Sequence, residues 1–193
     1  MDSSHIALID CFIPINFFSC YNFEDREIVC GVDIKVLIKI LTHIGKNDEI
    51  VFKFKNGDVD NLEIIIINDK FKKYYTMRLM DIISDELQVS EIPNTIDLKM
   101  DSKYFKTIIG EFKDIGDIIK FKFTNDNEIS LSCEGEMTKL VLVLNNDDIE
   151  FSNIREMEVD YSFEYFEKFS KGVNLGCEIE INIVDDCPIK MSY

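Results

Sequence analysis

The sequence predicts an α+β fold with mostly antiparallel sheets, because one helix-then-strand unit recurs along the 193 residues and strand patterns fill the rest. In each copy, apolar residues recur at helical spacing and then give way to a short run rich in Ile and Phe. The three copies join helix to strand at 34–44 and 49–55, at 101–116 and 117–123, and more loosely at 163–175 and 178–183. Repetition at such long spacing indicates duplicated domains rather than a solenoid.

The other strands are predicted where Val, Ile, Phe and Tyr alternate between clusters of Asn, Asp and Gly. They lie at 5–12, 17–23, 27–31, 62–67, 71–79, 95–100, 118–124, 129–133 and 140–144, and a last strand, helix and strand set begins at Met157. The acidic segment 80–93 ends in proline and has no clean period, which is typical of a linker. We therefore expect a first domain at 1–79, a linker at 80–93 and a second domain at 94–193.

Composition restricts the function classes. A hydrophobic content of 46% is enough for a packed core, whereas a formal charge of -16 argues against a DNA binder that is basic all over. Any contact with nucleic acid must come from a local face. No apolar run approaches the roughly 18 residues of a membrane span, so we expect a soluble protein with no membrane partner. The six cysteines form no CxxC pair and follow no secretory segment, which favours buried, reduced thiols in an intracellular protein.

Lysines gather on the outer faces of the predicted helices. On the first helix, Lys35, Lys39, Thr42 and Lys46 lie opposite the apolar stripe of Ile34, Leu37, Ile38, Leu41 and Ile44. On the second, Lys103, Lys106, Gly110 and Lys113 lie opposite Phe105, Ile108, Ile109, Phe112 and Ile115. The third helix places Lys168 and Lys171 beside Glu164 and Glu167. In so acidic a chain this repeated pattern indicates an arranged positive field, although an ordinary solvated helix surface would give the same spacing.

The residues needed for catalysis are scarce. The two histidines, His5 and His43, have no second ligand at metal spacing, and no glycine-rich phosphate loop is present in the sequence. The run 56–61 resembles a calcium loop but lacks its glutamate, so a hairpin turn is the better interpretation. We expect no enzyme, metal or cofactor. An enzyme that uses Cys133 or Cys177 with His43 is kept as an alternative from another class.

Several short motifs then resemble one family in chain order. They are the opening 1–8, Gly31-Val32-Asp33, the acidic linker 80–93, Ile115-Gly116-Asp117, the run 132–136 and Asp186-Cys187-Pro188. Together they are similar to proliferating cell nuclear antigen, the eukaryotic and viral sliding clamp. That resemblance implies two similar domains per subunit and three subunits closed head to tail into a ring, with helices lining the hole. It also implies a noncatalytic processivity factor of the nucleus, or of a viral replication site, with duplex DNA, DNA polymerase and a clamp loader as partners.

The resemblance gives the lysines a role as contacts to DNA phosphates without base readout. The DNA-facing residues that it implies are Lys35, Lys39, Lys46, Lys103, Lys106, Lys113, Lys168 and Lys171, with Lys39, Lys106 and Lys171 the strongest candidates. Positions that are often basic in the family hold Thr107, Gly110 and Glu164 here, which implies a weaker grip.

The resemblance also implies two protein-binding surfaces. Subunits of the family join by strand addition between segments that correspond to 71–79 and 138–145, and the implied interface residues are Tyr75, Met77, Leu140 and Leu142. Tyr75 is the expected anchor, or else an ordinary edge-strand residue. Partner proteins dock an apolar plug on positions that correspond to Met1, His5, Leu8, Val89, Ile92, Pro93 and Pro188.

Compared with the family, the chain begins inside the first domain and stops before the final tail. We therefore expect an incomplete first domain that lacks an opening strand and one helix, which leaves a sheet edge unpaired and apolar surface uncovered. The alternatives are a fragment, a gene model begun at an internal methionine, and a reduced clamp relative whose first domain is covered by something else. The second functional hypothesis is a checkpoint-type or degenerate clamp paralogue that acts as a protein-interaction module.

Overall fold

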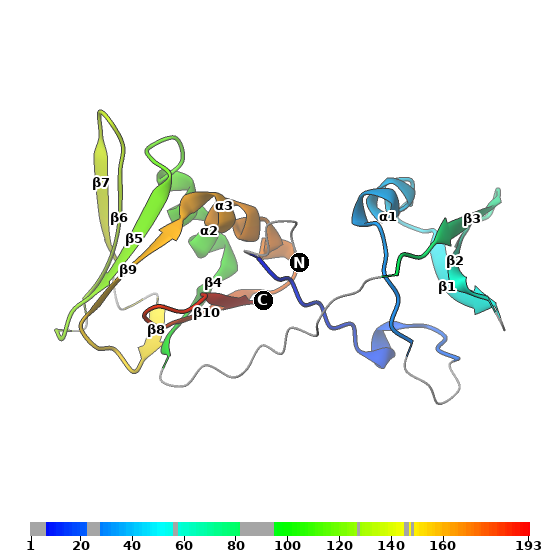
Figure 1. Cartoon of the computed structure of the whole chain (residues 1–193), viewed down its shortest axis with the longest axis horizontal. Helices are drawn as coiled ribbons and strands as arrows, with labels where there is room; N and C mark the ends of the chain where they lie inside the picture. The colour runs from blue at the N-terminus through cyan, green and yellow to red at the C-terminus, as the bar shows by residue number, and fades with distance from the viewer. Residues whose placement is uncertain are drawn as a thin grey trace. The chain divides into compact units, whose positions relative to one another are not determined.

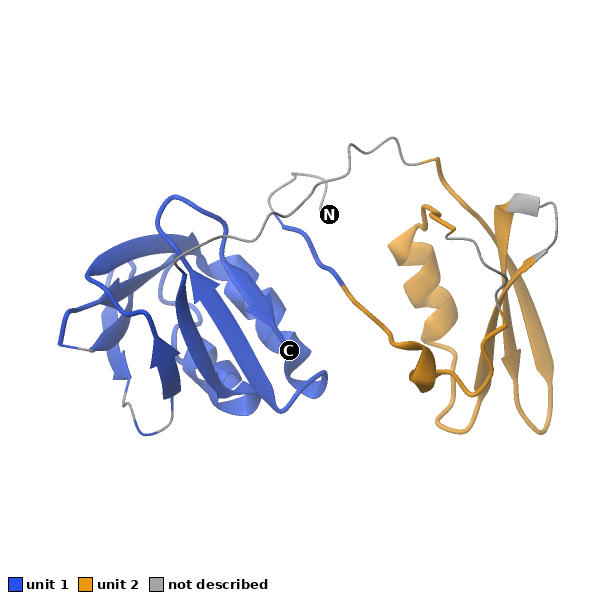
Figure 2. Ribbon diagram, turned by 90° about the horizontal axis from the view of Figure 1, so that it is seen from below, with its two compact units in different colours: residues 1–10, 90–193 blue, residues 11–89 orange. Residues whose placement is uncertain are grey.

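A computed structural model of the chain divides it into two compact units, which Figure 2 colours separately. Unit 2 is residues 11–89, and unit 1 combines residues 1–10 with residues 90–193. The structure describes residues 7–22, 28–55, 58–81, 95–126, 128–144, 147 and 149–193. Every strand pair among them is antiparallel, so the predicted α+β class is confirmed. Most of the predicted linker, residues 82–93, lies outside the described residues.

Unit 2 places one helix on a three-stranded sheet. Its elements are η1 (Ile15–Phe17), α1 (Ile34–Leu41), β1 (Glu49–Lys55), β2 (Asp58–Ile67) and β3 (Lys72–Arg78), and the strand order is β1-β2-β3 (Figure 1). Helix α1 begins where Asp33 Oδ1 accepts hydrogen bonds from the backbone N–H groups of Lys35 and Val36, at 2.8 and 3.2 Å. Alternate residues of β2, namely Leu62, Ile64 and Ile66, are buried in a small core with Ile40.

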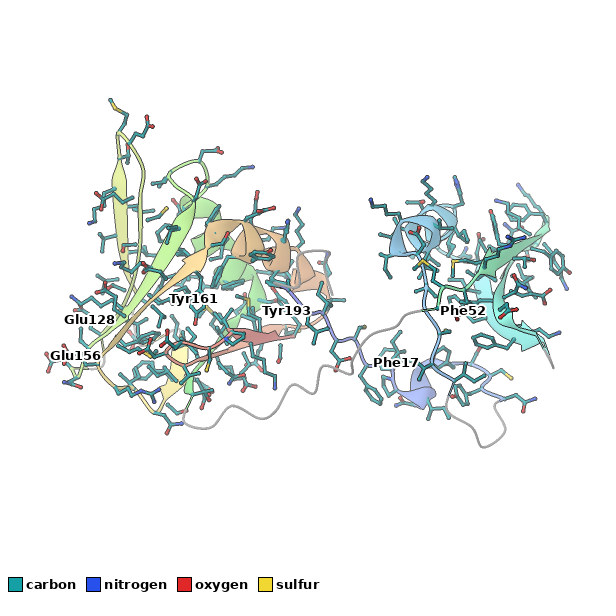
Figure 3. The ribbon with its side chains drawn as sticks, viewed as in Figure 1. Phe17, Phe52, Glu128, Glu156, Tyr161 and Tyr193 are labelled. Carbon is teal, nitrogen blue, oxygen red and sulfur yellow. The ribbon has the colours of Figure 1, made fainter. Side chains whose placement is uncertain are left out.

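The core face of unit 2 is only partly covered. Ile50 and Phe52 share the face of the buried β2 residues, because Phe52 pairs with Ile64 in register, yet both side chains are exposed. Figure 3 labels Phe52. Ile34 and Ile38 of α1 are exposed as well, although the helical pattern predicted them on the buried face. A single helix on three strands is too small to bury all of these side chains.

Three predicted strands in the first part of the chain are wrong in the residues that the structure describes. Residues 7–12 and 28–30 have no regular structure, and 17–22 begin in the turn η1 and continue without strand pairing. Gly31 makes only an isolated bridge to Met80. Phe12, Phe17 and Val29 are strongly exposed. The alternating apolar residues of these segments have no sheet on which to pack, so they do not form strands.

Unit 1 repeats a strand, helix and strand twice, as the sequence predicted. The elements are β4 (Ile96–Asp101), α2 (Ser102–Glu111), β5 (Ile118–Phe123), β6 (Ile129–Glu134), β7 (Lys139–Leu144), β8 (Ile149–Ser152), β9 (Met157–Ser162), α3 (Phe163–Phe169), η2 (Ser170–Asn174), β10 (Glu178–Ile183) and β11 (Lys190–Ser192). They form two four-stranded sheets, β11-β10-β4-β8 and β7-β6-β5-β9. Helices α2 and α3 lie side by side and contact each other (Figure 1). Strands β8 and β11 were not predicted.

One continuous core holds unit 1 together. It takes alternate residues from both sheets and the inner faces of α2 and α3, with Phe105, Phe112, Phe121 and Phe166 almost fully buried. Asp101 begins α2 as Asp33 begins α1, accepting hydrogen bonds from the N–H groups of the second and third following residues. At the other end of the chain Tyr193 donates from its hydroxyl to the Phe169 carbonyl, at 2.7 Å.

The expectation of buried thiols holds for Cys133 alone. Cys11, Cys20 and Cys177 are exposed, and Cys30 and Cys187 are half-buried. Cys11 and Cys20 lie in the irregular segment of unit 2, which has no sheet to cover it. All six cysteines are free thiols.

Candidate functional site: helical lysines, strand edges and a loop groove

The first group of candidate site residues lies on α1 and the turn after it. Lys35 and Lys39 are exposed on the helix, and Lys46 is exposed just before β1. The helix sequence, IKVLIKIL, contains no carboxylate, so its charge is entirely positive. Asp33 accepts backbone hydrogen bonds at the start of the helix. The charge of α1 is therefore opposite in sign to the formal charge of the chain, which is -16.

The second group follows α2. Lys103 and Lys106 are exposed on the helix and Lys113 is exposed just after it. Thr107 donates from its hydroxyl to the Lys103 carbonyl, at 3.0 Å, and so offers no free donor in place of a basic side chain. Gly110 leaves open space, because a Cβ there would meet nothing within 4 Å.

Carboxylates of α3 pair with two of the candidate lysines. Lys168 forms an ion pair with Glu164 one turn earlier on α3, and Lys113 pairs across the helices with Glu167, at 3.8 Å. Lys171 is exposed on η2. Five of the candidate lysines on the helices form no ion pair in the part of the chain that the structure describes. They are Lys35, Lys39, Lys103, Lys106 and Lys171.

The implied subunit joint falls on two sheet edges. Strand β3 ends the order β1-β2-β3 and β7 ends the order β7-β6-β5-β9, so within the described residues each strand has a neighbour on one side only. The proposed interface residues face inward. Met77 is 4% exposed and Tyr75 packs against the same small core, while Leu140 and Leu142 pack against the core of unit 1.

The alternate residues of those strands face outward and were missed from the sequence. Tyr74 is 70% exposed, and Val141 and Val143 are 53% and 51% exposed. The signal was present in the sequence, because the strict alternation of side chains on a strand separates 74 from 75 and 141 from 142. Large apolar side chains left open on two strand edges are a feature of interaction surfaces.

Near Pro188 the structure forms a shallow groove of about 360 Å³. It is lined by residues 158–161 of β9 and by the loop 184–188. Its rim carries Glu158, Asp160, Asp185 and Asp186, of which Glu158 and Asp160 pair with Lys120, at 2.6 and 3.7 Å. Of the other predicted docking residues, Leu8 is exposed, and Met1, His5, Val89, Ile92 and Pro93 lie outside the described residues.

Tyr161, labelled in Figure 3, is one of the residues that line this groove. Burial raises its pKa to about 12, and the nearby Cys187 and Asp185 act in the same direction. Its buried hydroxyl has no hydrogen-bond partner among the described residues. The ring packs on Phe121 and Phe166, with centroids 6.1 and 5.9 Å away.

The geometry gives little support to catalysis. Cys133 is 2% exposed, and burial raises the pKa of its thiol, whereas a nucleophile needs an accessible thiolate. His43 and Cys177 are both exposed. Among the described residues, no three His, Cys, Asp or Glu side chains converge as metal ligands would, and no helix has the length and apolar character to cross a membrane.

Comparison with known proteins identifies relatives along the whole chain. The family model of the proliferating cell nuclear antigen N-terminal domain matches residues 1–88. The DNA polymerase sliding clamp of Thermococcus fumicolans is 28% identical over 196 residues, covering 100% of this chain and 77% of the relative. The probable DNA polymerase sliding clamp 2 of Paramecium bursaria Chlorella virus 1 is 24% identical, covering 100% and 70%. The proliferating cell nuclear antigen of Chaetomium thermophilum is 25% identical, covering 100% and 77%.

Proposed function

The chain is a relative of proliferating cell nuclear antigen and of the DNA polymerase sliding clamps, and from this premise we propose that it is itself a sliding clamp. In this role it is a noncatalytic processivity factor that encircles duplex DNA and tethers replication and repair proteins to it. The observation that carries the proposal is that exposed, unpaired lysines project from helices of both units in a chain of charge -16.

The physical argument rests on the strength of attraction that a sliding ring needs. A ring that holds DNA by topology requires only a weak, screened attraction to phosphates, without contacts to bases. Lys35, Lys39, Lys103 and Lys106 provide point charges on flexible stems, which suit contacts that move along a backbone. Carboxylates elsewhere disfavour nonspecific binding of other polyanions. The ion pairs on α3 make the grip weaker still, so this side of the ring contributes less.

A ring also needs subunits that close on one another. We assign the joint to β3 of one copy and β7 of the next, a head-to-tail contact that three copies can close. The two apolar cores would then meet beneath the joined sheet. Tyr75 and Met77 contribute from one copy, and Leu140 and Leu142 contribute from the next. The proposed assembly is a homotrimer.

Partner proteins are proposed to dock at the groove beside Pro188. Leu8 is exposed and is proposed to contact the apolar plug, and Asp185 and Asp186 on the rim of the groove favour plugs flanked by Lys or Arg. DNA polymerase and a clamp loader are the partners that this function requires. The corresponding location is the nucleus, or a viral replication site if the chain comes from a large DNA virus.

The deciding experiment separates topological linkage from electrostatic binding. The full chain is allowed to thread onto linear duplex DNA, the ends are then blocked with bulky groups, and the sample is washed at about 1 M salt, where the screening length is roughly 3 Å. A clamp stays on blocked DNA and leaves when a nuclease opens one end. Loss from blocked DNA during the wash would contradict encirclement.

One observation favours a second candidate, a degenerate clamp paralogue that acts as a protein-interaction module. Glu164 and Glu167 of α3 pair with Lys168 and Lys113, so these two candidate lysines offer little free positive charge to DNA. For this candidate the chain is expected to be a monomer or an obligate heteromer. Light scattering after size-exclusion chromatography distinguishes it from a homotrimer.

A further inference from the structure

The backbone hydrogen bonds at the end of β3 reveal which residues offer free groups at its edge. The Leu79 N–H donates to Asp60 of β2, at 2.8 Å, whereas the next N–H, that of Met80, donates away from the sheet to Gly31, at 2.9 Å. Successive residues of an antiparallel strand alternate in this way. The N–H and C=O groups at the open edge of β3 therefore belong to its even-numbered residues, which are Lys72, Tyr74, Thr76 and Arg78.

The same reasoning applies to β7. The Gly135 N–H donates to the Thr138 carbonyl, at 2.9 Å, so 138 bonds toward β6 and so do 140 and 142. The groups at the open edge of β7 belong to Lys139, Val141 and Val143. In both strands, the residues with free backbone groups are also those with exposed side chains.

This agreement restricts how the two edges can pair. In antiparallel strands, residues whose backbone groups face the partner lie opposite one another, and their side chains share one face. Pairing β3 with β7 therefore places Tyr74 opposite Val141 or Val143 on the outer face. The alternate residues Tyr75, Leu140 and Leu142 meet on the inner face, so both cores end on the same side of one continuous sheet. If the free backbone groups of one strand belonged instead to its inward-facing residues, pairing would place the core face of one unit on the same side as the solvent face of the other.

We propose that the joint between two copies of this chain has a second apolar contact on its outer face, in which Tyr74 of β3 packs against Val141 and Val143 of β7. The inference rests on the proposed ring. It adds the residues that make β3 of one copy pair with β7 of the next and not with another strand edge. Tyr74 is 70% exposed and the two valines are 53% and 51% exposed, so the contact would bury surface that is otherwise open to water. Aromatic and β-branched side chains form favourable cross-strand pairs.

Charge on the two edges supports a second copy as the occupant. Lys72 and Arg78 flank Tyr74 and Thr76 on β3, in a chain with net charge -16. The β6–β7 hairpin carries Glu134 and Glu136. Lys139, the one cation on β7, is already paired with Glu134, at 2.8 Å. Because Glu134 is taken by Lys139, the exposed Glu136 is the carboxylate of this hairpin that is left to attract the basic edge.

The test measures self-association of the full chain by analytical ultracentrifugation. Tyr74→Lys and Val143→Lys are each expected to raise the dissociation constant on the order of ten-fold or more, as substitution of a central contact residue does. The matched control is Ile118→Lys, which puts the same charge on an exposed apolar residue of β5, an interior strand of the same sheet as β7. Tyr74 is exposed, so its substitution leaves the core of its own unit intact. Circular dichroism checks that each variant is folded.

A covalent readout complements the affinities. Residues opposite each other in a hydrogen-bonded antiparallel pair have Cα atoms about 5.5 Å apart, which suits a disulfide. The double variants Tyr74→Cys with Val141→Cys and Tyr74→Cys with Val143→Cys are oxidised and compared with the single variants, which control for the native thiols. One of the two double variants is expected to form cross-linked multimers, and it identifies the register.

The outcomes separate this inference from the function on which it rests. A wild-type chain that stays monomeric overturns the joint and the proposed ring together. A wild-type oligomer whose dissociation constant moves by less than about two-fold in both lysine variants, with neither double variant cross-linked, overturns the outer contact and leaves the ring in place.

Discussion

The Asp97 carboxylate connects three strands of unit 1 by accepting four hydrogen bonds. Its Oδ1 accepts hydrogen bonds from Thr95 and Asn182, at 2.5 and 2.8 Å, and its Oδ2 accepts from Ser152 and Asn153, at 3.0 and 3.2 Å. The donors lie on or beside β4, β10 and β8. Burial acts to raise the Asp97 pKa, but the four hydrogen bonds outweigh it, and the pKa is lowered from its ordinary value. The charged form is therefore favoured by folding.

Replacing Asp97 with Asn is expected to lower the free energy of unfolding by about 1 to 3 kcal/mol at pH 7, because charge-assisted hydrogen bonds are lost. The lowered pKa fixes the pH dependence. Asp97 contributes stability above its unfolded pKa of about 4 and loses it as the pH falls through its folded value. Urea unfolding should show the wild-type and variant curves converging in that acidic range. Asp126→Asn, in the exposed turn after β5, is the control, and a gap unchanged at low pH would contradict the assignment.

Tyr161 shows the opposite situation, a buried polar atom without a partner among the described residues. Its ring is well packed, so the substitution Tyr161→Phe keeps the contacts to Phe121 and Phe166 and removes only the desolvated hydroxyl. We expect the free energy of unfolding to rise by about 1 kcal/mol. Equilibrium denaturation measures the change. A loss of more than about 1 kcal/mol would mean that the hydroxyl has a partner in the folded protein.

At the scale of elements, the sequence was most informative where a pattern and a packing partner coincide. The strand at 49–55 and the strands of unit 1 up to 144 match within two residues at either end, because β-branched alternation there meets a sheet and a core. The helices were placed correctly but ended earlier than predicted, at Leu41 and Glu111. Residues 7–12 and 17–22 show the same alternation but lack a neighbouring strand, and periodicity alone cannot supply one.

Helix α2 offers a direct test of local propensity. Gly110 is the penultimate residue of α2, and a Cβ added there meets nothing within 4 Å. Gly110→Ala should therefore raise the free energy of unfolding by about 0.5 to 1 kcal/mol, because glycine loses more backbone entropy in a helix. Gly135→Ala is the contrasting variant, since its Cβ would lie 1.8 Å from the Ile115 carbonyl oxygen and must displace backbone. Thermal unfolding of both variants checks the opposite signs.

For the whole molecule, the arrangement of charge was only partly visible in the sequence. Helical spacing correctly placed the lysines of α1 and α2 on exposed faces. The pair Lys168–Glu164 follows from a spacing of four residues, but Lys113–Glu167 joins two helices and depends on how α2 and α3 pack. The exposed neighbours of the joint residues, Tyr74 among them, were not predicted, because an apolar alternation marks the core face of a strand and not the face that a second copy covers. A sequence pattern predicts on which face of a helix or strand a residue lies. Which residues of two different elements contact each other depends on how those elements pack in the fold.

The exposed lysines without ion pairs on α1 and α2 can be tested by charge reversal. Lys39→Glu and Lys106→Glu each remove one unpaired cation from a helix and should weaken binding to duplex DNA equally across sequences, because phosphates and not bases are contacted. If each lysine neutralises one phosphate, the slope of log affinity against log salt falls by about one per substitution. Fluorescence anisotropy over a salt series measures both quantities. Lys122→Glu, on an exposed strand position of β5, makes the same change in net charge away from the helices. An equal effect of Lys122→Glu would show that overall charge, and not the helical faces, governs the attraction to DNA.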